Sequence, residues 1–338
     1  MTSAARQATL ADVARASGVS HQTVSRVVNN HPNVAGKTRQ RVLESIGALN
    51  YRPNRAAKGL ASSRSGVIGI VSFGTNYFGP GQTFTEIERA VRARGYGLTL
   101  RNIDALTTQG LQGAIDDLAS SLVDGIVVNA PTVDLEPAQL STLKRPRPVV
   151  MTDVPKRAGL PSVVLEQTEG SGLATRHLLG LGHRRIAEIR GPLSWYSATE
   201  RHRAWAAAMR DAGLADGLSA VGDWTAAGGY AAARALLTRE PFTGLVVAND
   251  QMALGAMRAL RERGLRVPED VSVVGFDDLP EAAFFEPPLT TVRQDFAALG
   301  RQTVDYLLTL VQHPETPHHQ RTLYPQLVER LSTAQAPL

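Results

Sequence analysis

The sequence contains no cysteine, which excludes disulfide bonds, thiol catalysis and metal sites built on cysteine. It has no run of about eighteen apolar residues, so we expect no segment to span a membrane. The N-terminal stretch lacks the apolar core of a signal peptide and passes directly into a helical pattern, which predicts a cytoplasmic protein. The 338 residues exceed what one compact core holds, and they suit a small module joined to a two-lobed body.

The motifs of common enzyme classes are also absent. There is no G-x-G-x-x-G after the first strand-like run, no H-E-x-x-H and no G-x-S-x-G. The residues from Ala35 to Thr38 resemble the end of a P-loop, but His31 stands where its first glycine is required. The sequence therefore predicts a binding protein with no catalytic residues, no cofactor and no metal.

Charge is distributed unevenly along the chain. Residues 1–64 hold ten Lys or Arg against two Asp or Glu, whereas the remainder holds 26 basic and 29 acidic side chains. A short basic module on a mildly acidic body predicts that the module alone meets a polyanion. A basic solvated tail would give the same balance, so the pattern inside the module has to decide.

The basic module has the pattern of a helix-turn-helix. Thr9 can cap a first helix, with Asp12 three residues on as an imperfect capping box, and Gly18 can end it in a left-handed conformation. Ser20 can then cap a second helix. A third helix over about 37–49 is expected to bury its apolar positions Val42, Leu43, Ile46 and Leu49.

In a helix-turn-helix the second helix enters the major groove, and its first residues contact base edges. Glutamine can bond bidentately to adenine, and arginine and histidine suit the acceptors of guanine. The polar residues predicted to contact bases are His21, Gln22, Thr23, Ser25 and Arg26. The alternative is a generic helical hairpin, which the basic charge disfavours.

From Gly66 onwards, short apolar runs alternate with helical patterns. The strand-like runs are 67–73, 124–130, 148–154, 184–191, 244–250 and 271–278. The helical patterns are near 82–94, 109–121, 169–181, 198–212, 226–238 and 251–263. This alternation predicts an α/β body of two doubly wound lobes with a cleft between them.

Polar side chains cluster where these runs end, and parallel sheets hold ligands at the carboxyl ends of their strands. They are Asp153, Ser197, Arg201, Asn249, Asp250 and Asp277. Trp224 and Phe296 supply flat apolar surfaces. Such groups suit the hydroxyls and C–H faces of a sugar, although any one Asp at a strand end can be a helix cap.

Two runs resemble the LacI/GalR family of transcriptional regulators: TLADVARASGVSHQTVSRVVNN (9–30) and KTRQRVLESIGALNYRPNRAAKGLA (37–61). The resemblance continues to about residue 330. It implies a headpiece over 8–53, a hinge helix or linker over 54–64, and a ligand-binding and dimerisation domain over 65–334. Within the domain it implies an N-lobe of about 65–165 and 280–290, and a C-lobe of about 166–279 and 291–334.

The same resemblance extends the DNA-contacting set. Contacts with double-stranded operator DNA are implied for Thr9, Ser20, Asn29, Asn54, Ala57 and Leu60. Leu60 would enter the minor groove, and Gly59 leaves the hinge helix marginal until DNA and a partner hinge support it. One departure is Ala35-Gly36, which replaces the family's usual serine cap, so the third helix is expected to fray at its start.

For the pocket, the resemblance implies that Asp153, Arg201, Asn249 and Asp277 bond sugar hydroxyls while Trp224 stacks on the ring. Further lining residues would be Phe78, Pro80, Leu165, Ser197 and Phe296. The runs GPLSWYSATERHRAW and VANDQMALGAMRAL resemble the lactose-operon branch of the family more than its purine-sensing branch. Departures at Tyr77, Phe78, Thr83, Thr152, Leu165, Trp195 and Tyr196 leave the exact sugar open.

The expected activity is repression of a sugar-utilisation operon, with release from DNA by a small sugar inducer, a galactoside for preference. A homodimer is expected through Met252, Leu254, Ala256, Phe284 and Phe285. The family's tetramers use an added C-terminal leucine heptad, which the end of this sequence does not show. The alternatives are a periplasmic sugar-binding protein, or a family member that responds to another sugar, a phosphosugar or a nucleobase corepressor.

Overall fold

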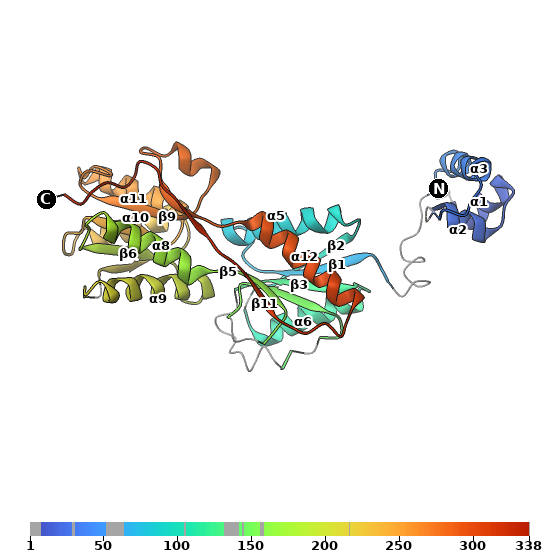
Figure 1. Ribbon diagram of the computed structural model, residues 1–338, viewed down its shortest axis with the longest axis horizontal. Helices are drawn as coiled ribbons and strands as arrows, with labels where there is room; N and C mark the ends of the chain where they lie inside the picture. Colours follow the sequence, from blue (N-terminus) through green and yellow to red (C-terminus); the bar gives the residue numbers. More distant parts are fainter. Residues whose placement is uncertain are drawn as a thin grey trace, which may run out of the picture. The chain divides into compact units, whose positions relative to one another are not determined.

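The computed structural model describes residues 8–28, 31–51, 64–104, 106–131, 142–143, 145–155, 159–215 and 217–337. The chain divides after Gly66 into two compact units, the headpiece and the body (Figure 1). The fold class predicted from the sequence, a helical headpiece followed by a two-lobed α/β body, is confirmed.

The headpiece contains three helices in its described residues, α1 (Leu10–Ser17), α2 (His21–Val28) and α3 (Gly36–Ala48). The capping box at α1 is complete, because the Thr9 side chain accepts from the Asp12 backbone while Asp12 accepts from the Thr9 backbone. Gly18 ends α1 at φ 62°, and the Ser20 hydroxyl accepts from the Thr23 backbone at 3.2 Å. These local signals fix the angle between the first two helices.

The core of the headpiece is small, and one prediction about it is wrong. Val13, Val24, Val27 and Val42 are buried, with Ile46 packed beside them. Leu43 and Leu49 are instead exposed at 48% and 36%, because a single face of α3 meets two short helices. No side chain caps α3 at Ala35, as expected there.

The body is built on two sheets. The first has the strands β1 (Val67–Ser72), β2 (Gly97–Asn102), β3 (Gly125–Asn129), β4 (Val149–Thr152), β5 (Ser162–Leu165) and β11 (Gln320–Leu323). Their order is β11-β5-β4-β3-β1-β2, and all of the recorded pairs are parallel.

The second sheet has the strands β6 (Ile186–Arg190), β7 (Ser219–Val221), β8 (Gly244–Val247), β9 (Ser272–Asp277), β10 (Thr290–Arg293) and β12 (Gln326–Val328). Their order is β12-β10-β9-β8-β6-β7. Only the edge strand β12 is antiparallel to its neighbour among the described strands. In each sheet the next two strands in sequence lie on opposite sides of the first strand: β2 and β3 flank β1, and β7 and β8 flank β6. The α/β sheets hold ligands at such a switch in strand order.

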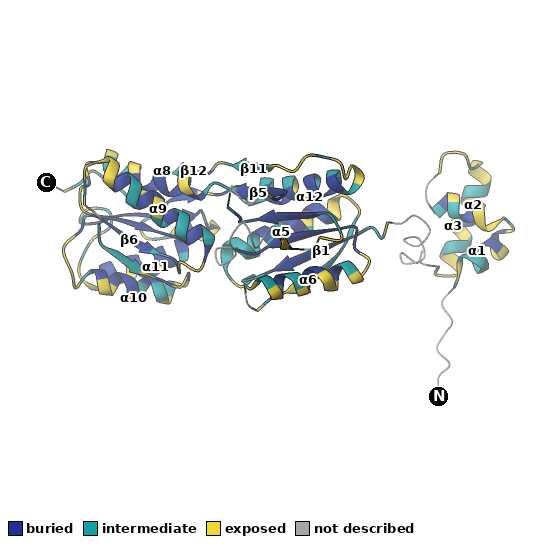
Figure 2. Cartoon of the chain, turned by 90° about the horizontal axis from the view of Figure 1, so that it is seen from below, coloured by how far each residue is buried: buried dark blue, intermediate teal, exposed yellow. Residues whose placement is uncertain are grey.

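Helices cover both faces of each sheet, so the strands are buried on both sides (Figure 2). On the first sheet, α6 (Thr108–Ser120) packs on one face, while α5 (Phe78–Ala93) and α12 (Phe296–Gln312) pack on the other. The second sheet lies between two helix pairs: α8 (Gln167–Gly180) with α9 (Tyr196–Asp211), and α10 (Ala226–Leu236) with α11 (Asp250–Glu262).

The first sheet and its helices form the first lobe, and the second sheet and its helices form the second lobe. The chain passes between the lobes at residue 166, at residues 294–295 and at residues 324–325. The first crossing was predicted, but the expected crossings near 280 and 290 are wrong. Residues 280–284 form a 3-10 helix that leads into β10 of the second sheet, whereas α12 and β11 belong to the first lobe. The apolar face of α12 shows that the helix is covered, but its sequence does not say by which sheet.

Among the described residues, no helix is long and apolar enough to cross a membrane.

Candidate functional site

The start of α2 presents the polar row predicted to contact bases. His21, Gln22 and Arg26 are exposed, and Thr23 and Ser25 are partly buried. Val24 and Val27 hold the opposite face of α2 in the core of the headpiece. The predicted contacts Asn29, Asn54, Ala57 and Leu60 lie outside the described residues.

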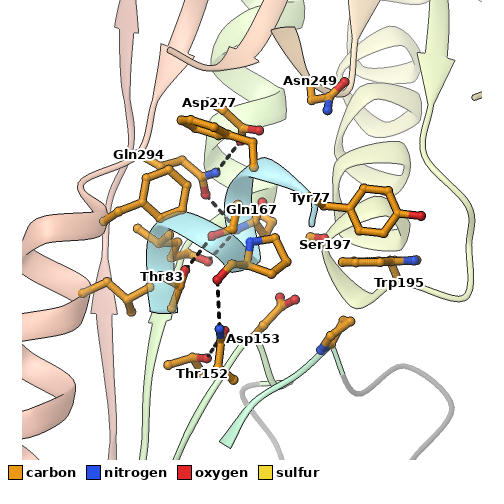
Figure 3. Close-up of a pocket in the computed structure, with 18 of the residues that line it drawn as sticks. Tyr77, Thr83, Thr152, Asp153, Gln167, Trp195, Ser197, Asn249, Asp277 and Gln294 are labelled. Carbon is orange, nitrogen blue, oxygen red and sulfur yellow. Dashed lines mark hydrogen bonds between the residues drawn. The ribbon is translucent and has the colours of Figure 1, made fainter. Parts of the chain in front are cut away.

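In the body, a cavity lies at the carboxyl ends of strands from both sheets (Figure 3). The space that the centres of water-sized molecules can occupy inside it is about 80 Å³. All ten residues predicted to bind the ligand line it: Phe78, Pro80, Asp153, Leu165, Ser197, Arg201, Trp224, Asn249, Asp277 and Phe296.

Arg201 is the central cation of this cavity. It extends from α9, and its guanidinium donates through Nε to Gln167 Oε1 at 2.8 Å and through Nη1 to the Ala248 carbonyl. Nη2 lies 3.6 Å from Asp277 Oδ1, and both side chains are less than a tenth exposed. Burial lowers the pKa of Arg201 from its ordinary value, while Asp277 and Asp153 oppose this effect.

Two carboxyl groups share the cavity with Arg201. Burial raises the pKa of Asp277 to about 6, against the opposing effects of Arg201 and a hydrogen bond from Gln294. Burial also raises the pKa of Asp153 to about 6, and Arg201 again opposes the rise. One guanidinium facing two carboxyls favours neutral hydroxyl groups over anions in this space.

Asn249 and Trp224 are fixed to each other. Asn249 Oδ1 accepts from the Met252 backbone at 2.9 Å and so caps α11, and its Nδ2 donates to the Trp224 carbonyl at 3.0 Å. The indole Nε1 of Trp224 is buried and has no hydrogen-bond partner among the described residues. A Cβ at Gly191 would lie 2.3 Å from the Trp224 ring, so the loop after β6 requires glycine.

Three residues of the cavity adopt a backbone conformation that L-amino acids rarely take. Asp153, Trp224 and Asp277 have φ of 55°, 72° and 104°, and each ends or follows a strand. Such conformations cost free energy and persist where the surrounding structure holds them. All three residues line the cavity.

Aromatic side chains form one wall of the cavity. Trp195 contacts Tyr77 edge-on at 5.2 Å between ring centres, and Trp224 in the same way at 5.6 Å. Phe73 lies 5.7 Å from Trp195. Phe73 and Tyr77 follow β1 whereas the two indoles belong to the second lobe, so this wall joins the lobes. On another side, Phe78 meets Phe296 edge-on.

Several lining residues were missed by the sequence prediction of the site. Asn129 ends β3 and donates to the Pro80 carbonyl at 3.0 Å, and Gln294 follows β10. The rule of polar residues at strand ends could have identified both. Gln167 follows β5, a strand that the apolar pattern did not reveal. The remaining missed residues are Pro131 and Leu299.

The prediction of the dimer surface is wrong for two residues. Met252 and Ala256 are fully buried inside their own chain. This face of α11 packs so closely on α10 that a Cβ at Gly255 would lie 1.8 Å from the Ala226 carbonyl oxygen. Leu254 and Phe284, in contrast, are exposed at 46% and 87%, and Phe285 is partly buried.

Comparison with known proteins agrees with both units. Residues 9–54 match the bacterial regulatory proteins of the lacI family, and residues 175–333 match the periplasmic binding protein-like domain. The chain is 37% identical to the lactose operon repressor of Escherichia coli (strain K12) over 305 residues, which cover 90% of this chain and 85% of that protein.

It is also 35% identical over 333 residues to the HTH-type transcriptional repressor PurR of Haemophilus influenzae (strain PittEE), covering 96% of this chain and 98% of that protein. Its structure matches that of the lac repressor dimer bound to operator and the anti-inducer ONPF, with a TM-score of 0.90 and 35% identity over 97% of this chain and all of that chain. These relatives are repressors and not enzymes, and the chain belongs to the LacI family of bacterial regulatory proteins.

Proposed function

We propose that this protein is a homodimeric repressor that binds operator DNA through α2 and is released by a neutral sugar, a galactoside, bound between the lobes of its body. The observation that carries the proposal is the cavity itself. Residues from loops far apart in the sequence converge on it with one guanidinium, two carboxyls and an aromatic wall. Sugar rings require this combination of planar polar groups and apolar faces.

The charges in the cavity distinguish between ligand classes. A phosphosugar would bring two negative charges next to Asp153 and Asp277, with Arg201 as the nearby cation that both carboxyls already share. A neutral sugar brings hydroxyl groups, which can donate to the carboxylates and accept from the guanidinium. A purine is neutral too, and one relative is a purine repressor, so the nucleobase is the second candidate.

Release from DNA requires that the sugar binds two arrangements of the body with different affinity. The cavity is lined from both lobes, so a ligand that contacts Asp153 in one lobe and Asp277 in the other fixes the angle between them. The first lobe directly follows the segment that leads from the headpiece. A change in lobe angle would alter the spacing of the paired headpieces in a dimer.

The proposal can be tested with the full-length protein and a DNA duplex selected by it from a random pool. Calorimetry would compare methyl β-D-galactoside, methyl β-D-glucoside, galactose 6-phosphate and hypoxanthine. We expect the galactoside to bind and to weaken DNA binding, and the phosphosugar not to bind. If hypoxanthine tightens DNA binding, the ligand is a nucleobase corepressor and not a sugar inducer. If only the glucoside binds, the inducer is a glucoside and not a galactoside.

A further inference from the structure

Two of the three crossings between the lobes within the described residues are joined by a pair of amide side chains. Gln167 is the first residue of α8 and follows the crossing from β5, and Gln294 lies in the crossing from β10 to α12. Gln167 Nε2 donates to Gln294 Oε1 at 3.0 Å. Both side chains are buried, at 6% and 7% exposed, so this bond is shielded from solvent.

The amide pair connects the two charged residues of the cavity. Arg201 Nε donates to Gln167 Oε1 at 2.8 Å. Gln294 Nε2 donates to Asp277 Oδ1 at 2.7 Å, as Figure 3 shows. Because Arg201 Nη2 also lies 3.6 Å from Asp277, the four side chains form a closed ring. The three hydrogen bonds of this chain run in one direction, from the cation through both amides to the anion, where Asp277 accepts.

This directionality restricts the amide orientations. If the Gln294 amide turned over, its oxygen would face the Asp277 carboxylate and its nitrogen would lose its acceptor. Hydrogen bonds in such a buried chain polarise one another, and a buried group left without its partner is costly. A movement of Arg201 or Asp277 is therefore passed to both amides, and through them to the two crossing segments.

We propose that Gln167 and Gln294 are positioning residues that convert sugar contact at Arg201 and Asp277 into a change of angle between the lobes. This inference rests on the proposed function, because it explains how a sugar in that cavity acts on DNA binding. Sugar hydroxyls that bond the guanidinium and the carboxylate alter both ends of the ring at once. The crossing segments then shift together, since the amide bond ties one to the other.

The third crossing does not share this arrangement. Tyr324, which lies in it, is 67% exposed and does not line the cavity. A residue that responds to the ligand has to reach both the cavity and a crossing segment. Gln167 and Gln294 meet both conditions, and each is linked directly to one charged group of the site.

The informative variant is Gln167→Glu. A glutamate there can still accept from Arg201, so the guanidinium keeps its partner, but an ionised glutamate cannot donate to Gln294. The matched control is Gln320→Leu, which removes a glutamine hydrogen bond to Ser162 within the first lobe, away from the cavity. Gln294→Leu breaks the bridge from the other side and serves where Gln167→Glu does not fold.

The readout is the ratio of operator dissociation constants with and without methyl β-D-galactoside, at a concentration that saturates each protein by calorimetry. Because each protein is saturated with the sugar, a change in this ratio reports the coupling between sugar binding and DNA binding and not a change in affinity for the sugar. We expect the ratio to fall about tenfold in Gln167→Glu and in Gln294→Leu, to fall no further in the double variant, and to stay unchanged in Gln320→Leu.

The possible failures differ from one another. A wild-type protein that does not respond to the galactoside would overturn the proposed function and this inference with it. A wild-type response that both single variants retain in full would overturn the amide bridge alone. Independent, multiplying losses in the double variant would also overturn it, because they would mean that the two amides act separately.

Discussion

The guanidinium of Arg201 lies 3.6 Å from the centre of the Phe276 ring, with its carbon over the ring face. Phe276 belongs to β9 and is 2% exposed, so it forms a rigid platform beneath the cation. The planar group therefore has a ring on one face and hydrogen-bond partners along its edge. Few residues other than arginine satisfy both.

The first prediction follows from that geometry: Arg201→Lys will not preserve sugar binding. A lysine ammonium cannot reach Gln167, Ala248 and Asp277 together, nor stack as a plane on Phe276. We expect Arg201→Lys and Arg201→Ala both to weaken galactoside affinity by about ten- to hundredfold in calorimetry. Arg203→Lys, an exposed position on the same helix, is the control. Wild-type affinity in Arg201→Lys would show that charge alone is sufficient.

The second prediction concerns pH. The pKa of Asp153 is raised by burial from 3.8 to about 6, so the folded protein binds this proton more tightly than the unfolded chain. The resulting stabilisation is complete below the unfolded pKa and is lost as the pH rises through 6. Between about pH 4.5 and pH 7, the unfolding free energy measured with urea is expected to fall by about 1–2 kcal/mol more in the wild type than in Asp153→Asn.

The exposed ion pair of Asp270 with Arg266 provides a control of opposite sign. The pKa of Asp270 is lowered to about 2 by its hydrogen bonds with Arg266, so its contribution is present above about pH 4 and lost only as the pH falls further. The difference in unfolding free energy between pH 4.5 and pH 7 is therefore expected to be the same in Asp270→Asn as in the wild type. An equal fall in unfolding free energy between pH 4.5 and pH 7 in the wild type and in Asp153→Asn would contradict the raised pKa of Asp153.

The sequence was sufficient for the class of fold because its signals are local. The capping box at Thr9 and the left-handed Gly18 define the helix-turn-helix, and the apolar runs mark the buried strands. The lobe boundaries failed because β10 is short and polar at its ends and because α12 packs on a sheet formed far earlier in the chain. Such long-range pairing is not encoded in any single segment.

For the candidate site, the rule of polar residues at strand ends and the family resemblance together named ten lining residues. They did not name Gln167 or Gln294, whose role depends on a side-chain bond between crossings 127 residues apart. The prediction of the dimer surface was wrong for a related reason. Met252 and Leu254 share one apolar helix, and only the packing of α10 decides which of them is covered.

The third prediction addresses the aromatic wall. Trp195 is the ring that contacts Phe73 and Tyr77 of one lobe and Trp224 of the other. Trp195→Ala would remove that wall and leave space beside the sugar. We expect affinity for methyl β-D-galactoside to fall more than affinity for an aryl galactoside, whose ring can occupy the space. Trp195→Phe is the conservative control, and equal losses for both ligands in the alanine variant would contradict a role in selectivity.

The fourth prediction concerns the headpiece. Thr9 Oγ1 donates to Asp12 Oδ2 at 2.6 Å, in addition to the backbone bonds of the capping box. Thr9→Ala is expected to lower the unfolding free energy of the headpiece by about 1 kcal/mol, and Thr9→Ser to restore it. Thermal unfolding followed by circular dichroism would measure both. No change in the alanine variant would mean that the cap contributes nothing to stability.

Two exposed apolar side chains in the body form the basis of the last prediction. Leu254 and Phe284 are exposed at 46% and 87%, and Phe285 beside them is partly buried. Two hollows on the surface are each lined in part by Leu254 and Phe285. An apolar patch of this kind is covered in a dimer, and a two-fold axis places the same patch on both subunits.

We therefore expect the wild-type protein to sediment at micromolar concentration with twice its chain mass of 36.2 kDa. Leu254→Lys would bring two like charges together across the axis, so this variant is expected to sediment as a monomer. Because two headpieces on one dimer bind two half-sites together, the monomer should also lose operator affinity by at least about a hundredfold. The control is Leu122→Lys, since Leu122 is a leucine of similar exposure (57%) near the end of α6. If Leu254→Lys remains a dimer while Leu122→Lys dissociates, the interface lies elsewhere, and a monomer that binds operator as tightly as the wild type would contradict recognition of two half-sites.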